Sequence, residues 1–327
     1  MKQAVLVFAV ALVITLAIGP AVINYLRKMK FGQKILEIGP KWHMNKQNIP
    51  TMGGFMFIIG IAAAVIIGNI VMGEISVSSL AVLGLAVAYG AVGLVDDYAK
   101  IKKKENAGLT PKQKLVLQIL VAGVFILVLF LGSSGLPQLW IPFTGISFSW
   151  PWPLYIVFAA FVIVGADNAV NLTDGIDGLA ASVTLPVAIF FVFVGFRRGD
   201  MGVVIFSAAL AGALLGFLRY NFNPAKVFMG DTGSPFLGGA VAGLAFACEM
   251  PLILLLVGLI YIIETLSVIL QVTYFKATHG KRLFKMAPIH HHFEMCGWGE
   301  KKIVLVFTGI TVVLCLLAYH VALAPLF

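Results

Sequence analysis

Short stretches of polar side chains interrupt an otherwise apolar chain and hold most of the residues that could do chemistry. One of them, Asn168–Leu179, lies between two apolar runs and contains Asp174 and Asp177. Carboxylates in such surroundings are costly and usually functional. At a spacing of three, both would project from one face of a helical turn, and a following helix N-terminus would favour their charge. The stretch predicts a site for a cation or a polar ligand; a plain connecting loop is the alternative.

A second stretch places Asp96 and Asp97 at the end of an apolar run, with Lys100 one turn further on. Adjacent carboxylates at a helix C-terminus repel each other and face an unfavourable dipole. Lys100 offsets part of this cost, and a metal ion could offset more. An ordinary solvated helix end is the alternative interpretation.

A third stretch, Gly230–Ser234, holds Asp231 between glycines that permit a tight turn. Thr232 and Ser234 add hydroxyl groups where the next helix is expected to begin, which is a natural place for phosphate oxygens. Because Mg²⁺ takes oxygen ligands together with substrate phosphates, Asp231 suits the role of a Mg²⁺ ligand. The alternative is an aspartate that only caps a helix.

The last polar loop contains three consecutive histidines, His290, His291 and His292. Adjacent side chains point in different directions, so regular structure would not bring all three to one zinc ion. Imidazoles that bind phosphate or carbonyl oxygens fit better. Near the other end of the chain, the basic stretch Lys46–Gly54 could approach a phosphate or simply lead into a helix. Glu264, inside a late apolar run, is expected to be a buried structural carboxyl group that is kept neutral and has no catalytic role.

Composition identifies the class of protein. Of the 327 residues, 60% are hydrophobic and 11% are charged, whereas an ordinary soluble domain has about 25% charged residues. The chain is therefore expected to be a polytopic membrane protein in contact with the lipid bilayer. The net charge of +9 lies in short loops, which favours anionic lipid over nucleic acid as the partner. The three cysteines show neither zinc spacing nor a disulfide framework.

A membrane-crossing helix needs about 20 apolar residues. This rule predicts ten spans, with nine as the alternative count because the eighth is short. The expected spans are 3–25, 53–72, 77–95, 115–132, 154–170, 178–196, 201–218, 235–248, 252–275 and 303–325. The first reads as a retained anchor. Between spans, 133–153 predicts a small outer β-hairpin whose tryptophans anchor it at the interface.

The predicted architecture is an all-α polytopic integral membrane protein that forms one domain over 1–327. All but three of the 23 Lys and Arg residues lie in the loops 26–52, 96–114, 219–234 and 276–302. With ten spans these loops and the polar stretches share one side, which the positive-inside rule assigns to the cytoplasm. Both termini are then outside. A nine-span count would break this separation after residue 235.

Several motifs carry a resemblance to a known family. They are Pro50–Gly54, Asp96–Lys100, Asn171–Leu179, Gly230–Ser234 and His290–Glu294. From end to end the chain resembles the phospho-N-acetylmuramoyl-pentapeptide-transferase family, within the polyprenyl-phosphate N-acetylhexosamine-1-phosphate transferase superfamily. The aspartate motifs are shared by the superfamily. The Pro-Thr-Met-Gly-Gly and Ala-Pro-Ile-His-His-His-Phe-Glu runs are typical of the muramoyl-pentapeptide branch.

The resemblance implies a ten-helix enzyme of the bacterial inner (plasma) membrane, usually a homodimer. It implies transfer of phospho-MurNAc-pentapeptide from UDP-MurNAc-pentapeptide to undecaprenyl phosphate. The products are UMP and lipid I, the first lipid-linked intermediate of peptidoglycan, and Mg²⁺ is the implied cofactor. The active site is expected to face the cytoplasm.

The resemblance also implies roles for individual residues. Asp231 is expected to be the chief Mg²⁺ ligand, Asp96 or Asp97 to orient or deprotonate the lipid phosphate, and His290 to join the catalytic group. The expected substrate-binding residues are Lys46, Thr51, Lys100, Lys104, Lys112, Asn168, Asn171, Asp174, Asp177, Asn221, Phe228, Ser234, Gln271, His291 and His292. Lysines and histidines would hold phosphate or sugar oxygens, and Phe228 would stack on uracil.

Two other functions are weighed against this one. A transferase that moves a UDP-N-acetylhexosamine phosphate onto the same lipid is the nearest alternative, and the His290–Glu294 run argues against it. A transporter would place its charges near the membrane midplane and often shows inverted repeats. Here the charges gather at one side, and no repeat is visible.

Overall fold

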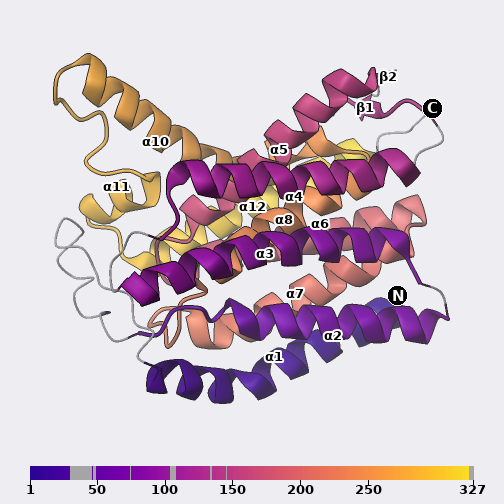
Figure 1. Cartoon of the computed structure of the whole chain (residues 1–327), viewed down its shortest axis with the longest axis horizontal. Helices are drawn as coiled ribbons and strands as arrows, with labels where there is room; N and C mark the ends of the chain where they lie inside the picture. The colour runs from indigo at the N-terminus through magenta and orange to yellow at the C-terminus, as the bar shows by residue number, and fades with distance from the viewer. Residues whose placement is uncertain are drawn as a thin grey trace.

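The computed structural model describes residues 1–29, 46, 49–73, 75–103, 108–132, 135–144 and 146–323, and they form a bundle of long helices (Figure 1). Within these ranges nine helices are long and apolar enough to cross a membrane. They are α1 (Lys2–Lys28), α2 (Gly54–Met72), α3 (Val77–Lys103), α4 (Pro111–Gly132), α5 (Trp152–Thr173), α6 (Leu179–Arg198), α7 (Met201–Asn221), α10 (Leu259–Ala277) and α12 (Glu300–Leu323). The fold class predicted from the sequence is confirmed.

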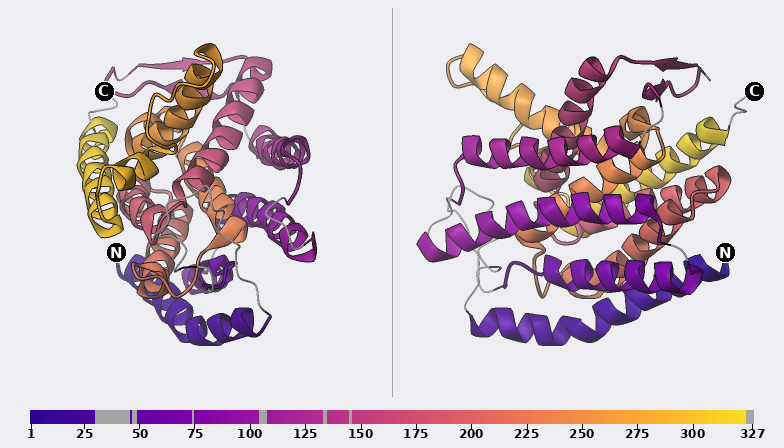
Figure 2. Two further views of the ribbon diagram at one scale, coloured as in Figure 1. Left: turned by 90° about the vertical axis from the view of Figure 1, so that its left-hand side faces the viewer. Right: turned by 45° about the vertical axis from the view of Figure 1, so that its right-hand side comes forward.

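The predicted eighth span corresponds to α8 (Gly230–Ala247), which starts earlier than the predicted residue 235. Its first turn holds Asp231 and polar neighbours, which is why α8 is less apolar than the nine spans. The start of α1 and the last turns of α12 lie at the same end of the bundle (Figure 2). The ten predicted spans thus correspond to the nine helices that meet the length and hydropathy criterion in the described ranges, together with α8.

The predicted ninth span is broken into shorter helices. It begins as a 3₁₀ turn, η2 (Pro251–Ile253), and continues as α9 (Leu254–Val257) and α10, with Gly258 between the last two. In Figure 1, α10 leans away from the other helices and leads to the short helix α11 (Ile289–Met295). The chain between α10 and α12 therefore reaches the polar end of the bundle.

The centre of the bundle is formed by α6, α7 and α8. In α7, 83% of the spanning window is buried. The side chain of Asp200 caps this helix by accepting hydrogen bonds from the backbone N–H groups of Gly202, at 2.9 Å, and Val203, at 3.1 Å. Around this centre pack α1, α2, α3, α5 and α12.

Small residues let α3 and α8 approach closely, as is common for helices in membranes. A Cβ atom added at Gly93 would lie 1.5 Å from the carbonyl oxygen of Asp231. Glycine at 93 therefore brings the first turn of α8 against the last turns of α3. This contact sets Asp231 beside the aspartates that end α3.

The predicted hairpin is present at the opposite end of the bundle from α11 (Figure 1). Strand β1 (Gln138–Trp140) pairs antiparallel with β2 (Ser147–Ser149). The expectation that both tryptophans anchor at the membrane interface is wrong for Trp140, which is only 6% exposed and packs into the core.

Candidate active site

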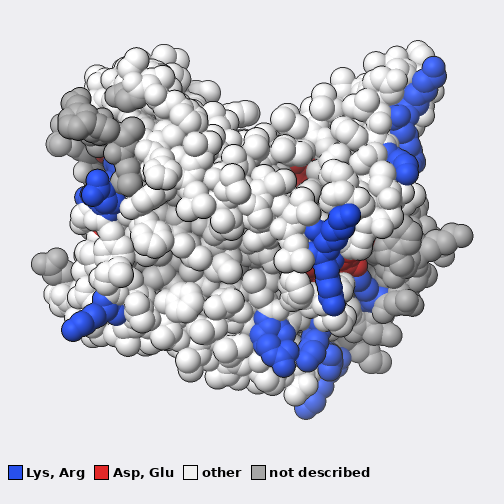
Figure 3. Space-filling model, turned by 180° about the vertical axis from the view of Figure 1, so that it is seen from behind, with Lys and Arg blue, Asp and Glu red and all other residues white. Residues whose placement is uncertain are grey.

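The polar motifs meet at the end of the bundle where α3 ends and α11 lies, on the left in Figure 1. Figure 3, seen from behind, shows Lys and Arg side chains gathered at this same end with acidic side chains among them. Charge is therefore concentrated where the sequence-predicted site residues are found.

Asp231 is the hub of this end. Its Oδ1 accepts a hydrogen bond from the Asn171 side chain at 2.6 Å and lies 3.3 Å from the Lys114 Nζ. Its Oδ2 accepts from the Lys100 Nζ. We call Asp96, Asp97, Lys100, Lys114, Asn171 and Asp231 the aspartate–lysine centre. Helices α3, α4, α5 and α8 each contribute to it.

The two adjacent aspartates of α3 have different partners. Asp96 forms the expected contact with Lys100, at 2.8 Å, and accepts from the backbone N–H of Leu109 at 2.7 Å. Asp97 accepts from both the backbone N–H and the hydroxyl of Thr232, each at 2.8 Å. Because the first N–H groups of a helix lack partners within it, Asp97 acts as a cap on α8 supplied by α3.

Thr51 and Ser234 brace the start of α8. Gly230 has a φ of +71°, and a Cβ atom there would lie 2.6 Å from the Thr51 Oγ1 and 2.9 Å from the Asp97 Oδ2. The Ser234 hydroxyl donates to the Gly230 carbonyl oxygen at 3.1 Å and accepts from Asn171 at 3.2 Å. Both predicted substrate-binding residues are thus buried beside the centre.

Asp174 and Asp177 lie between two helices, as the predicted spans 154–170 and 178–196 require. Helix α5 ends at Thr173 and α6 begins at Leu179, so both aspartates lie in the intervening turn. The Asp174 carboxyl group has no hydrogen-bond partner among the described residues. Burial, together with the negative charges of Asp231, Asp97 and Asp177, raises its pKa from 3.8 to about 8.

Asp177 belongs to a second cluster. Its carboxylate contacts the Lys46 Nζ at 2.6 Å and accepts from the Asn223 side chain at 3.0 Å and from the backbone N–H of Ala225 at 2.9 Å. Glu300, at the start of α12, accepts from Lys46 at 2.6 Å and from the backbone N–H of Asp177 at 3.0 Å. Sequence reasoning did not identify Glu300; its only signal was a carboxylate at the border of an apolar run.

Each of the three histidines has a different partner. His290 Nδ1 lies 2.9 Å from a carboxylate oxygen of Glu264, and His291 Nδ1 lies 2.6 Å from one of Glu294. His292 Nδ1 accepts from the backbone N–H of Lys285 at 3.1 Å. The prediction that the three rings do not share one metal ion is consistent with this geometry. In the described ranges no group of three or more His, Cys, Asp or Glu side chains is arranged to hold a metal.

Several predicted binding residues lie outside the aspartate–lysine centre. The Asn168 amide donates to Gln118 and to the Val164 carbonyl oxygen, so it joins α5 to α4. The buried Asn221 donates to the Val227 carbonyl oxygen. Gln271 accepts from the backbone N–H groups of Leu283 and Phe284 and pins the loop after α10.

Three further predictions concern other residues around the site. Lys112 is exposed, whereas Lys114, two residues later on α4, reaches Asp231. The half-buried Phe228 pairs its backbone with Pro50 and Gly53, which brings the start of α2 to the site. Lys104 lies outside the described residues.

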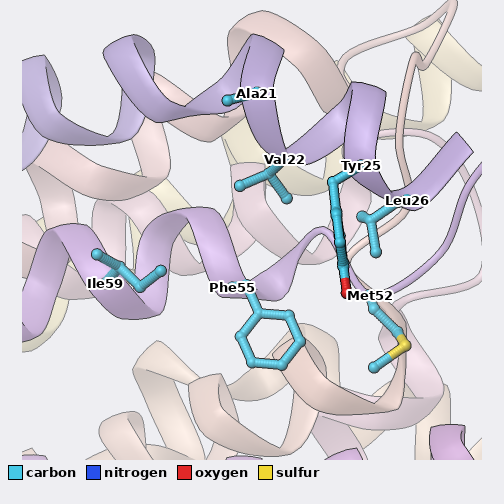
Figure 4. A pocket seen from close by; sticks show the side chains of 7 residues that line it. All are labelled: Ala21, Val22, Tyr25, Leu26, Met52, Phe55 and Ile59. Atoms are coloured by element: carbon cyan, nitrogen blue, oxygen red, sulfur yellow. The ribbon is translucent and has the colours of Figure 1, made fainter. Parts of the chain in front are cut away.

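Two surface hollows lie away from the carboxylates. A pocket of about 500 Å³ separates α1 from the start of α2, and Figure 4 shows that its lining is apolar apart from the Tyr25 hydroxyl. A groove of about 320 Å³ runs between α10 and the following loop and includes Gln271, Lys276 and Arg282. Neither contains a residue of the aspartate–lysine centre.

The donor set at the aspartate–lysine centre fits Mg²⁺. Its carboxylates are hard oxygen ligands, and Mg²⁺ in proteins is often held by one or two of them plus substrate phosphates. Burial, and after it the negative charges of Asp231, Asp97 and Asp177, raises the pKa of Asp174. A divalent cation at Asp231 would offset the negative charges that Asp174 faces.

Comparison with known proteins gives a consistent result. Residues 79–249 match glycosyl transferase family 4. The chain is 49% identical over 319 residues to a phospho-N-acetylmuramoyl-pentapeptide-transferase of Clostridium perfringens (strain 13 / Type A), covering 96% of this chain and 97% of the relative. It is 46% identical over 303 residues to a protein of the same name from Listeria monocytogenes serotype 4b (strain CLIP80459), covering 93% of each.

Proposed function

The chain belongs to the phospho-N-acetylmuramoyl-pentapeptide-transferase family, within glycosyl transferase family 4, and from this premise we propose its reaction. It transfers phospho-MurNAc-pentapeptide from UDP-MurNAc-pentapeptide to undecaprenyl phosphate. The products are lipid I and UMP. The observation that carries the proposal is the meeting of Asp231 with Lys100 and Lys114 at one end of a membrane bundle.

The reaction joins two anionic substrates. A new bond forms between an oxygen of the lipid phosphate and the phosphorus that carries the sugar, while the bond from that phosphorus to UMP breaks. Because like charges must approach, positioning and neutralisation of charge supply most of the catalysis. Lys100 and Lys114 are half-buried, so their positive charges act where water screens them less than at the surface.

We propose that Asp231 is the chief Mg²⁺ ligand, with Asp174 close enough to sense its charge. A bound Mg²⁺ supplies positive charge to phosphate oxygens. Asn171 orients the Asp231 carboxylate through a 2.6 Å hydrogen bond. This donor set supports an oxygen-preferring divalent cation over zinc.

The geometry distinguishes the two aspartates of α3. Asp96 contacts Lys100 and so controls the lysine that faces Asp231. Asp97 accepts two hydrogen bonds from Thr232 in the first turn of α8. We therefore propose Asp96 as the aspartate that orients the lipid phosphate and Asp97 as the residue that holds Asp231 in place.

The second cluster is proposed to serve the nucleotide side of the donor. Lys46 lies between Asp177 and Glu300, with its Nζ 2.6 Å from each carboxylate. A lysine held by two carboxylates keeps one orientation and can present its remaining N–H to a phosphate or ribose oxygen. Phe228, half-buried near the start of α2, is proposed to stack on uracil.

The site is proposed to face the cytoplasm from the bacterial plasma membrane, because basic side chains gather at its end of the bundle (Figure 3). A homodimer is proposed from the family resemblance.

The test is UMP release by the purified protein with undecaprenyl phosphate, Mg²⁺ and one of two donors. Turnover with UDP-MurNAc-pentapeptide but not with UDP-N-acetylglucosamine is expected, and EDTA should abolish it. Turnover with UDP-N-acetylglucosamine alone would assign the protein to the hexosamine branch. If a folded, monodisperse sample released no UMP with either donor, transferase activity would be contradicted.

A further inference from the structure

Glu264 and His290 form a pair whose side chains are both fully enclosed. Each has a relative exposure of 0%. One Glu264 oxygen, Oε2, lies 2.9 Å from His290 Nδ1 and also faces the backbone N–H of His290 at 3.5 Å. The backbone nitrogen and the ring nitrogen Nδ1 of His290 thus both contact one Glu264 oxygen. These two contacts hold the imidazole ring in one orientation.

The other polar atom of each side chain has no partner. Glu264 Oε1 and His290 Nε2 are buried without a hydrogen bond among the described residues. Leaving a buried polar atom unpaired is costly, and such atoms in a folded protein call for an explanation. Here both occur in one pair, beside the motif that carries Asp174.

The free nitrogen of His290 faces the turn between α5 and α6. A Cβ atom added at Gly175 would lie 2.1 Å from His290 Nε2 and 2.5 Å from Cε1. Gly175 itself is exposed. Gly175, which directly follows Asp174, therefore lies against this nitrogen, and its lack of a Cβ atom makes room for the ring.

We propose that Glu264 is a positioning residue that holds His290 with its hydrogen on Nδ1, so that Nε2 is kept as an acceptor facing the Asp174–Gly175 turn. The inference rests on the proposed function and deepens it. Glu264 Oε2 accepts from the backbone N–H of His290, and we take it as the acceptor for Nδ1 as well; in a neutral imidazole the other nitrogen, Nε2, then keeps its lone pair. His290 then presents an unprotonated Nε2 to that turn, and the ring packed against Gly175 holds the position of the neighbouring Asp174.

The same logic applies to histidines in other enzymes, where a carboxylate on one ring nitrogen sets the role of the other. Glu264 was expected from the sequence to be only structural. The pairing could not be predicted from the sequence because Glu264 lies in α10 and His290 in α11. The bend of α10 away from the bundle and the return of the chain through α11 bring the two together.

The first test compares Glu264→Gln, which preserves volume, with Glu249→Gln, an exposed carboxylate whose side chain lies near Arg198. Glu264→Gln should lower kcat by about 10-fold or more, with the KM for UDP-MurNAc-pentapeptide within about 2-fold. Glu249→Gln should match the wild type. Wild-type kcat in Glu264→Gln, or a rise in KM alone, would overturn the proposal.

The second test needs no substrate, so its result is independent of the proposed function. In protein labelled with ¹⁵N-histidine, the His290 signals, assigned with His290→Asn, should show a protonated Nδ1 and an unprotonated Nε2. In Glu264→Gln this preference should weaken. An unchanged preference, or a wild-type ring protonated on Nε2, would overturn the role of Glu264. The spectra could match this prediction while the protein turns over no donor. In that case the proposed function is wrong, but the role of Glu264 in positioning His290 is supported.

A third test uses the contact between Gly175 and the His290 ring. Gly175→Ala should lower kcat because its Cβ meets a ring that Glu264 holds still, and the loss should be smaller in the Glu264→Gln background. Gly165→Ala on α5, where nothing lies within 4 Å of the added Cβ, is the control. Additive losses in the double variant would contradict a ring fixed by Glu264.

Discussion

Asp97 on α3 accepts two hydrogen bonds from Thr232 on α8, one from the backbone N–H and one from the hydroxyl, each at 2.8 Å. Asp97→Ala removes both and leaves buried donors unpaired, which should cost about 1–3 kcal/mol of stability. Thr232→Val should cost about 1 kcal/mol and reduce turnover less. Thermal unfolding in detergent, alongside UMP release, checks both. If Asp97→Ala lost all activity at an unchanged melting temperature, Asp97 would be a chemical group and not a cap.

Gly93 controls the spacing between the same two helices. A Cβ atom there would lie 1.5 Å from the Asp231 carbonyl oxygen, so Gly93→Ala must separate α3 from the start of α8. A displacement near 1 Å of catalytic groups costs about 100-fold in rate, and we expect a loss of at least that size. Gly84→Ala in the same helix, with nothing within 4 Å of the new Cβ, should retain activity. Near-normal turnover of Gly93→Ala would contradict the described packing.

The raised pKa of Asp174 predicts a pH-dependent stability. The unfolded chain loses this proton near pH 4, whereas the folded chain holds it until the pH reaches about 8. The folded state therefore loses stability as pH rises through this window. Asp174→Asn should raise the melting temperature at pH 7.5, without Mg²⁺ or substrate, and the gain should shrink toward pH 5. Equal gains at both pH values would contradict a protonated Asp174.

Two lysines of α4 provide a matched comparison. Lys114 reaches Asp231 and is half-buried, while Lys112 is exposed. Loss of a hydrogen bond between charged groups is worth about 1.5–3 kcal/mol, so Lys114→Gln should lower kcat/KM by roughly 10- to 100-fold. Lys112→Gln should change it less than about 2-fold. A larger loss of kcat/KM in Lys112→Gln than in Lys114→Gln would contradict this assignment and favour Lys112, the residue predicted from the sequence.

The lysine comparison also shows what the sequence could and could not predict. Hydropathy located the membrane helices because each span must satisfy its backbone hydrogen bonds within itself and face lipid. The contact between Asp96 and Lys100 was predictable because both lie on one helix at a spacing of four. Lys112 and Lys114 differ by about 200° around α4, and only the rotation of α4 in the bundle decides which faces Asp231.

The remaining differences have related causes. Glu264, Glu300 and Lys114 meet partners far away in the sequence, and those pairings depend on tertiary packing that one sequence does not reveal. The spacing of Asp174 and Asp177 suits a helical turn, but both lie in the turn between α5 and α6. Gly178, with a φ of +77°, directly precedes α6. The early start of α8 was hidden because its polar first turn resembles a loop.

The most direct test of the account is UMP release by Asp231→Asn under the conditions that support wild-type turnover. The substitution keeps the shape of the side chain and removes the charge that meets Lys100, Lys114 and the proposed Mg²⁺. A folded, monodisperse Asp231→Asn protein is expected to release no UMP above background from UDP-MurNAc-pentapeptide, undecaprenyl phosphate and Mg²⁺. Near-normal turnover at the same Mg²⁺ concentration would contradict the central role of Asp231.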